Sequence, residues 1–110
     1  GGMGMAASAN IGDNHMLFEP VHGSSPTHAG KDKVNPIAAI SSVQLMLDSL
    51  GARNDDEHAT TCGEILGSAI ASHLSEGGAM TYDLGGDAST SEVGQAIAER
   101  FEALLNENYA

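Results

Sequence analysis

The sequence predicts an α/β fold in which helices pack on a short sheet. Three stretches carry apolar residues every three or four positions, which is the pattern of a helix with one buried face. A short apolar run with an aromatic residue precedes them and is typical of a strand. The chain has 110 residues, of which 41% are hydrophobic, enough for the core of one domain. Residues 1–110 are therefore expected to form a single segment.

The N-terminal part contains small residues and then the apolar run. Residues 1–14 are rich in Gly, Ala, Ser and Asn, which indicates either a loop that allows close approach or a short strand. A turn is expected at Gly12–Asn14. Residues 15–21 are expected to form a buried strand that ends at Pro20.

Asn35 and Pro36 predict the start of the first helix. Asn caps free backbone N–H groups, and Pro at the first helical position loses no hydrogen bond. Gly51 is expected to end this helix. Its apolar stripe comprises Ile37, Ile40, Val43, Leu47 and Leu50.

Two further helices are expected downstream. One spans about 57–76 after a solvated linker at 53–57, and the other runs from a capping box at Ser89 and Glu92 to about Asn106. The segment between them, 80–90, is rich in turn residues and expected to be non-helical. The helices expose more apolar surface than one or two strands can cover, so we expect the chain to be part of a longer protein. The residues expected to be buried are Cys62, Leu66, Ala69, Ile70, Leu74, Val93, Ile97, Phe101 and Leu104.

The composition narrows the possible partners and compartment. The formal charge of -11 repels nucleic-acid phosphates and anionic lipids, so neither nucleic acid nor membrane is an expected partner. No apolar run approaches the roughly 20 residues of a membrane span. Cys62 is the only cysteine, which excludes an intrachain disulfide and favours a cytoplasmic location.

The segment Glu19–Pro36, EPVHGSSPTHAGKDKVNP, concentrates unusual residues in one loop. It holds both lysines and all three prolines of the chain. A loop between a strand and a helix places backbone N–H groups where a phosphate or nucleotide binds. The lysines form a local cationic spot, although they also fit a role as exposed solubilising charges. The loop has neither of the common phosphate-binding glycine patterns.

Other candidate residues have simpler interpretations. His15, His58 and His73 stand singly, so we interpret them as surface or core residues rather than metal ligands. Cys62 lies on an apolar helix face and no serine occupies a nucleophile elbow, so we predict no catalytic residue and no metal site in this chain. Tyr82 and Asp83 are open to a site role, but such residues beside a glycine pair usually form a turn.

Three stretches together resemble the C-terminal third of the β-decarboxylating dehydrogenases, the family of 3-isopropylmalate and isocitrate dehydrogenases. They are GGMGMAASANIGD, FEPVHGSSPTHAGKDKVNPIAAISS and TYDLGGDASTSEVGQAI, in the order of the family. The likeness is greatest to the 3-isopropylmalate dehydrogenases. It implies that residues 1–110 are the C-terminal portion of the cofactor-binding domain of a longer enzyme with an isopropylmalate dehydrogenase-like fold.

The resemblance implies that the loop clasps the adenosine half of NAD or NADP. His22 would lie against the adenine, Asn35 would hydrogen-bond it, and Gly2 would lie near the nicotinamide. The residues that would border the cofactor are Glu19, His22, Gly23, Ser24, Ser25, Pro26, Thr27, His28 and Asn35.

Two positions depart from the family pattern. Thr27 stands where members that prefer NAD have an aspartate and NADP-dependent isocitrate dehydrogenases have a lysine, and His28 beside it is also atypical. Tyr82 matches a tyrosine that helps to bind NADP, but Gly86 stands in place of the accompanying arginine. We expect NAD, with NADP as the alternative.

The catalytic groups of the family lie upstream of the part represented here. They comprise the aspartates that hold Mg²⁺ or Mn²⁺, a tyrosine and a lysine for proton transfer, and an arginine cluster for the hydroxy-acid substrate. The resemblance therefore implies an oxidoreductase of 3-isopropylmalate, acting in leucine biosynthesis as a homodimer, of which this chain is the cofactor-binding segment. Isocitrate dehydrogenase and a non-catalytic nucleotide-binding module are the alternatives.

Overall fold

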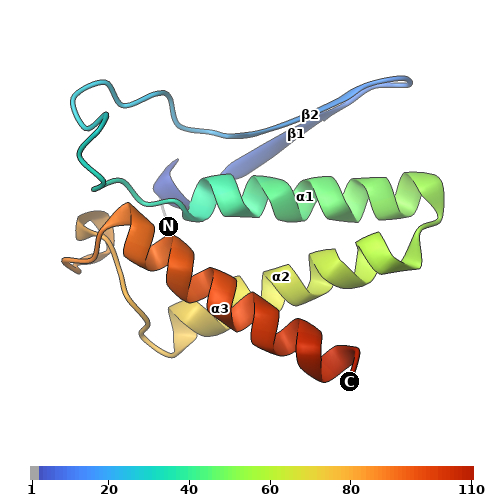
Figure 1. Ribbon diagram of the computed structural model, residues 1–110. Helices are drawn as coiled ribbons and strands as arrows, with labels where there is room; N and C mark the ends of the chain where they lie inside the picture. The colour runs from blue at the N-terminus through green and yellow to red at the C-terminus, as the bar shows by residue number, and fades with distance from the viewer. Residues whose placement is uncertain (1–2) are drawn as a thin grey trace.

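The computed structural model describes residues 3–110, which form a β-hairpin followed by three α-helices (Figure 1). Helix α1 packs against both strands and against α2, and α3 packs against α2. The α/β fold with a short sheet is confirmed, and α1 is the helix that covers the sheet. The elements are η1 (Met3–Met5), β1 (Ala7–Ile11), β2 (Met16–Pro20), α1 (Ile37–Asn54), α2 (Glu57–Ser75), η2 (Tyr82–Leu84) and α3 (Thr90–Asn108).

The hairpin pairs β1 and β2 in an antiparallel register from Ala7 opposite Pro20 to Ile11 opposite Met16. The Gly12 N–H donates to the His15 carbonyl at 2.9 Å and closes the turn, so the alternative of a short strand followed by a turn is confirmed. The strand expected at 15–21 is present as β2 and ends at Pro20 as predicted, but its predicted burial is wrong, because β2 alternates between half-buried and exposed residues. Among the described residues it pairs only with β1, and α1 lies against this small sheet.

Helix α1 begins next to the expected cap. The Asn35 side-chain oxygen accepts the Ile37 N–H at 2.9 Å, which confirms the capping role, although the first helical residue is Ile37 rather than Pro36. The prediction that Gly51 ends the helix is wrong, because α1 continues to Asn54 and stops at Asp55 with a left-handed φ of 52°. Val43, expected in the buried stripe, is 45% exposed.

Gly51 serves the packing of α1 on α2 instead of ending a helix. A Cβ atom at this position would overlap Thr60 Oγ1 and lie 2.7 Å from the Thr60 backbone nitrogen. On the facing side, a Cβ atom at Gly63 of α2 would overlap Asp48 Oδ1. These glycines therefore allow the two helices to approach closely.

The second and third helices confirm most of the sequence pattern. The Asp56 carboxylate accepts the N–H groups of His58 and Ala59 at the start of α2. At the start of α3, Ser89 and Glu92 form the predicted capping box. Four of the residues expected to be buried are only half-buried, namely Cys62, Leu74, Phe101 and Leu104. Helix α3 extends two residues beyond the predicted end, to Asn108. The segment 80–90 is largely irregular and forms no α-helix before Thr90, as predicted, and it contains the short 3₁₀ helix η2.

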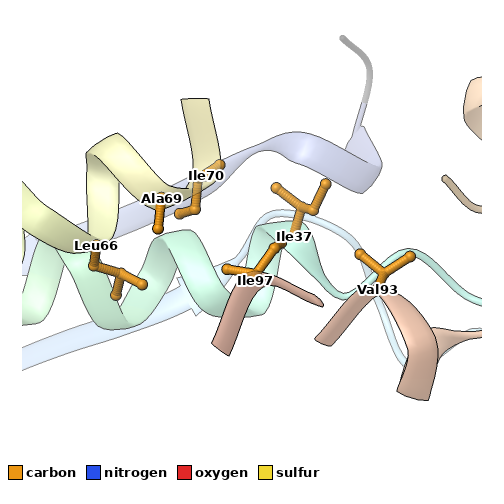
Figure 2. Close-up of a cluster of buried hydrophobic side chains, with 6 residues drawn as sticks. All are labelled: Ile37, Leu66, Ala69, Ile70, Val93 and Ile97. Atoms are coloured by element: carbon orange, nitrogen blue, oxygen red, sulfur yellow. The ribbon is translucent and has the colours of Figure 1, made fainter. Parts of the chain in front are cut away.

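The core lies where the three helices meet. Figure 2 shows Ile37 of α1 between side chains of α2 and α3. Such apolar contact is the main favourable contribution to folding. The cluster comprises Ile37, Leu66, Ala69, Ile70, Val93 and Ile97. Because Ile37 is the first residue of α1, this core also fixes the end of the loop that precedes the helix.

Candidate functional site

The loop from Val21 to Pro36 connects the end of β2 to the start of α1 and lines two neighbouring pockets. Tyr82 of η2 lines both of them. The loop pocket has a volume of ≈ 330 Å³ and is lined by Gly4, His22, Gly23, Ser24, Ser25, Val34, Asn35, Tyr82 and Asp83. The lysine pocket has a volume of ≈ 640 Å³ and is lined by Thr27, His28, Lys31, Lys33, Tyr82, Gly86, Asp87 and Ala88.

A hydrogen-bonded group at the loop pocket joins the start of α1 to η2. The Asn35 amide nitrogen donates to Asp83 Oδ2 at 3.1 Å, and Thr81 Oγ1 donates to Asp83 Oδ1 at 2.5 Å. Asn35 is buried and Thr81 is fully buried. Partial burial opposes ionisation of Asp83, but the hydrogen bonds from Thr81, Asn35 and its own backbone outweigh it and hold the pKa of this carboxyl below its usual value.

Two rings form the wall of the lysine pocket. The His28 and Tyr82 rings are stacked, with centroids 5.6 Å apart and planes inclined by 27°. Ser25 Oγ lies 3.0 Å from His28 Nδ1 and helps to orient the imidazole. A flat aromatic surface beside exposed cations suits a ligand that combines a ring with negative charge.

The basic residues of the chain have two different roles. Arg53 donates to the Gly12 carbonyl at 2.7 Å and attaches α1 to the hairpin turn, and Arg100 pairs with Glu76 between α3 and the end of α2. The lysines, Lys31 and Lys33, both line one pocket. The acidic chain thus places its lysines at the predicted loop, beside Asp87.

The far end of the loop is attached to α3. The backbone N–H and hydroxyl of Ser91 both donate to Asp32 Oδ1 at 2.9 Å. The Thr90 hydroxyl donates to the Val34 carbonyl at 2.5 Å. A carboxylate at a helix N-terminus is also favoured by the helix dipole. These contacts hold the loop between two helix N-termini, those of α1 and α3.

The structure brings together most of the residues predicted from the sequence. His22, Gly23, Ser24, Ser25 and Asn35 line the loop pocket, and Thr27 and His28 line the lysine pocket. Glu19, exposed on β2, and Pro26 line neither of them. Gly2 lies outside the described residues.

The η2 segment contributes two residues to the loop pocket. The sequence favours a turn role for Tyr82 and Asp83, yet both line the loop pocket together with Gly4. No local pattern indicates this arrangement, because these residues are separated from the loop by two long helices. Only the family resemblance points to Tyr82, as a residue near NADP.

His73, interpreted from the sequence as a surface or core residue, lies in the core. His73 is fully buried, and its Nε2 lies 2.6 Å from the Ala79 carbonyl, so this nitrogen carries the proton and donates.

Within residues 3–110, no group of three His, Cys, Asp or Glu side chains is arranged to hold a metal ion. No α-helix in this part of the chain is both long and apolar enough to cross a membrane.

The fold is that of an α/β protein, and the site combines stacked rings, amide and hydroxyl groups and cations beside a helix N-terminus. The chain belongs to the isocitrate/isopropylmalate dehydrogenase family, whose model matches residues 1–97. It is 47% identical over 100 residues to a 3-isopropylmalate/3-methylmalate dehydrogenase of Methanocaldococcus jannaschii, covering 91% of this chain and 28% of that protein. It is 42% identical over 104 residues to an isocitrate/homoisocitrate dehydrogenase of Thermus thermophilus, covering 94% of this chain and 29% of that protein.

A solved structure has the same fold over nearly the whole chain. The apo crystal structure of a β-decarboxylating dehydrogenase from Thermococcus kodakarensis matches with a TM-score of 0.84 and 38% sequence identity. The match covers 98% of this chain and 30% of that one. The chain therefore spans less than a third of the length of these relatives.

Proposed function

We propose that the chain is the cofactor-binding segment of an enzyme that oxidises and decarboxylates 3-isopropylmalate with NAD. The observation that supports this most directly is the pair of pockets between the Val21–Pro36 loop and η2. The loop follows a strand and precedes a helix, a place where nucleotides bind in α/β proteins. Residues 1–110 would then be the C-terminal portion of the cofactor-binding domain.

The chemistry of the pocket walls fits an adenosine with its phosphates. The stacked His28 and Tyr82 rings offer a flat apolar surface for a base or ribose, and Ser24 and Ser25 offer hydroxyl groups. Lys31 and Lys33 offer positive charge to the phosphates. The exposed loop side chains would give the ligand its orientation, and the bound cofactor would accept the hydride.

The choice of substrate rests on similarity. The Methanocaldococcus relative named for 3-isopropylmalate is 47% identical, and the Thermus relative named for isocitrate and homoisocitrate is 42% identical. This difference favours 3-isopropylmalate, the step that would belong to leucine biosynthesis, and keeps isocitrate as the alternative.

The choice of cofactor rests on the lysine pocket. Thr27 carries no charge that would hold or repel a 2′-phosphate, so it favours neither cofactor. Gly86 lines the same pocket in place of the arginine that accompanies the tyrosine in NADP-dependent relatives, and this missing cation supports NAD as the proposed cofactor. The two lysines beside it and Tyr82 favour NADP as the alternative, and the Haloferax volcanii relative, 38% identical, is an isocitrate dehydrogenase named for NADP.

The metal and the acid–base groups are expected in the part of the enzyme that precedes this segment. The described residues do not fit a divalent metal site, so no step through Mg²⁺ or Mn²⁺ is assigned to them. We also propose that the complete enzyme is a homodimer in the cytoplasm.

The test is an assay of the full-length polypeptide that contains this chain. With Mg²⁺ or Mn²⁺ present, 3-isopropylmalate or isocitrate is combined with NAD or NADP, and formation of the reduced cofactor is followed by absorbance. We expect the highest kcat/KM with 3-isopropylmalate and NAD. If only isocitrate is turned over, isocitrate replaces 3-isopropylmalate as the proposed substrate. Cofactor binding without turnover of either acid would instead support the non-catalytic nucleotide-binding module.

A further inference from the structure

Each polar atom of the Asn35 side chain contacts another group of the protein. Its residue is 6% exposed. Its Oδ1 accepts the Ile37 N–H at 2.9 Å, and its Nδ2 donates to Asp83 Oδ2 at 3.1 Å and lies 3.4 Å from Met5 Sδ. An amide nitrogen has two hydrogens to donate, and both are directed at partners of this chain. Asn35 thus connects the start of α1 to η1 and η2, and its amide hydrogens are not free to bind a ligand.

Asp83 fixes the orientation of this amide. If the amide were reversed, its oxygen would face the Asp83 carboxylate and its NH₂ group would face the Ile37 N–H, so both hydrogen bonds would be replaced by repulsion. The Thr81 hydroxyl donates to the other Asp83 oxygen and holds the carboxylate in place. The orientation of Asn35 therefore depends on an acceptor at residue 83.

This contact joins two parts of the loop-pocket wall. Asn35 and Asp83 are 48 residues apart in the sequence, and both line the pocket together with Gly4 and Tyr82. A Cβ atom at Gly4 would lie 3.0 Å from Asp83 Oδ2, so the segment around η1 packs against the same carboxylate. Loss of the acceptor at residue 83 would thus move the start of α1 relative to Tyr82.

We propose that Asp83 is a positioning residue of the cofactor site. Its carboxylate locks the Asn35 amide and thereby sets the distance between the Val21–Pro36 loop and η2, the two walls that receive the nucleotide. This inference rests on the proposed function of the pocket. It assigns to the Asn35 side chain a structural role, in place of the direct contact with adenine that the family resemblance implies.

The geometry allows an exchange experiment in the full-length enzyme. Asn35→Asp puts two carboxylates about 3 Å apart, so we expect the KM for the cofactor to rise about tenfold with a smaller change in kcat. Asp83→Asn keeps an acceptor for Asn35 and gives Thr81 a donor, so its KM is expected to stay within about twofold. In the double variant Asn35→Asp/Asp83→Asn the amide and the carboxylate exchange places, and the KM is expected to return to within about threefold of wild type.

Two further readouts separate positioning from simple loss of structure. The KM of Asn35→Asp is expected to fall at lower pH, because the two carboxylates then share a proton, while the KM of the double variant does not follow this profile. Asp13→Asn removes the same charge at the exposed hairpin turn and is the matched control, with an unchanged KM.

The outcomes are distinguishable. If the double variant is as impaired as Asn35→Asp, Asn35 contacts the cofactor directly and the positioning role is wrong. If the pair is coupled in the thermal unfolding midpoint but not in the KM, the contact is structural only, which also overturns the proposal. If the wild-type enzyme shows no cofactor-dependent oxidation, the proposed function fails. Wild type, Asn35→Asp, Asp83→Asn and the double variant then still test the Asn35–Asp83 contact through cofactor binding by calorimetry and through unfolding. If the effects of the two single substitutions simply add up in these measurements, the positioning role is wrong.

Discussion

At the scale of single residues, the pKa of Asp83 is set by a balance between burial and hydrogen bonding. Partial burial disfavours its charged form, whereas three hydrogen bonds favour it. The bonds prevail and lower the pKa, so the carboxylate remains charged to lower pH than an ordinary aspartate. The same carboxylate accepts a hydrogen bond from Asn35, which caps α1. One ionisable group therefore supports both a helix start and a pocket wall.

The lowered pKa predicts a pH dependence of stability. Because the folded-state pKa of Asp83 lies below its ordinary value of 3.8, the ionised group stabilises the fold above that value, and this contribution is lost as the pH falls through the folded-state pKa. Urea unfolding of wild type and Asp83→Asn from about pH 6 to about pH 3 should show a steeper loss of unfolding free energy in wild type. Parallel curves for the two proteins would contradict this assignment, and Asp13→Asn again provides the control.

At the scale of elements, the contact of α1 with α2 depends on glycine. Gly51 and Gly63 face side-chain or backbone atoms of the other helix at distances that leave no room for a Cβ atom. Glycine in a helix interior costs about 1 kcal/mol relative to alanine in propensity, so its presence here reflects packing. The same two helices contribute Ile37 and Leu66 to one core.

The packing role of Gly51 predicts opposite effects of alanine in two helices. Gly51→Ala should destabilise the protein by about 1 to 3 kcal/mol, because the new methyl group collides with Thr60. A methyl group added at Gly94 in α3 would meet no atom within 4 Å, so Gly94→Ala is expected to stabilise by about 0.5 to 1 kcal/mol. Chemical denaturation of both variants measures the difference. A neutral Gly51→Ala would show that the helices shift apart at little cost.

At the scale of the whole molecule, the hairpin is the least covered part. The radius of gyration is 14.6 Å, whereas a compact domain of this length has about 13 Å. Ile11, Leu17 and Val21 are each more than half exposed. Figure 1 shows the hairpin projecting above α1, while α2 and α3 lie on the other side. A sheet of two strands with so much apolar exposure is marginal without further cover.

This exposure predicts that the protection of backbone amides from hydrogen exchange differs along the chain. In the 110-residue chain alone, backbone amides of β1 and β2 should exchange with solvent faster than those of α2 and α3, because few buried contacts oppose opening of the hairpin. In a full-length protein of the relatives' size, the difference should shrink as additional sheet covers these strands. Hydrogen exchange followed by mass spectrometry measures both. Equal protection of strands and helices in the short chain would contradict the prediction.

Local signals in the sequence are sufficient for the helices and for the loop. Caps such as Asn35, Asp56 and Ser89 act through groups two or three residues away, so their patterns can be recognised directly. The role of Gly51 is not predicted, because a glycine that ends a helix and one that admits a neighbouring helix look the same in one dimension. The burial of the strand at 15–21 is overestimated because an apolar run does not reveal how many strands will cover it.

The composition and motifs of the chain thus established three helices, a short sheet and a loop rich in the residues of a nucleotide site. The joining of that loop to η2 came from packing, because the Asn35–Asp83 contact and the His28–Tyr82 stack each span about 50 residues and two helices. Such contacts carry no local sequence pattern. They follow from the angle at which α1, α2 and α3 meet around Ile37, and that angle depends on side-chain shape across the whole core.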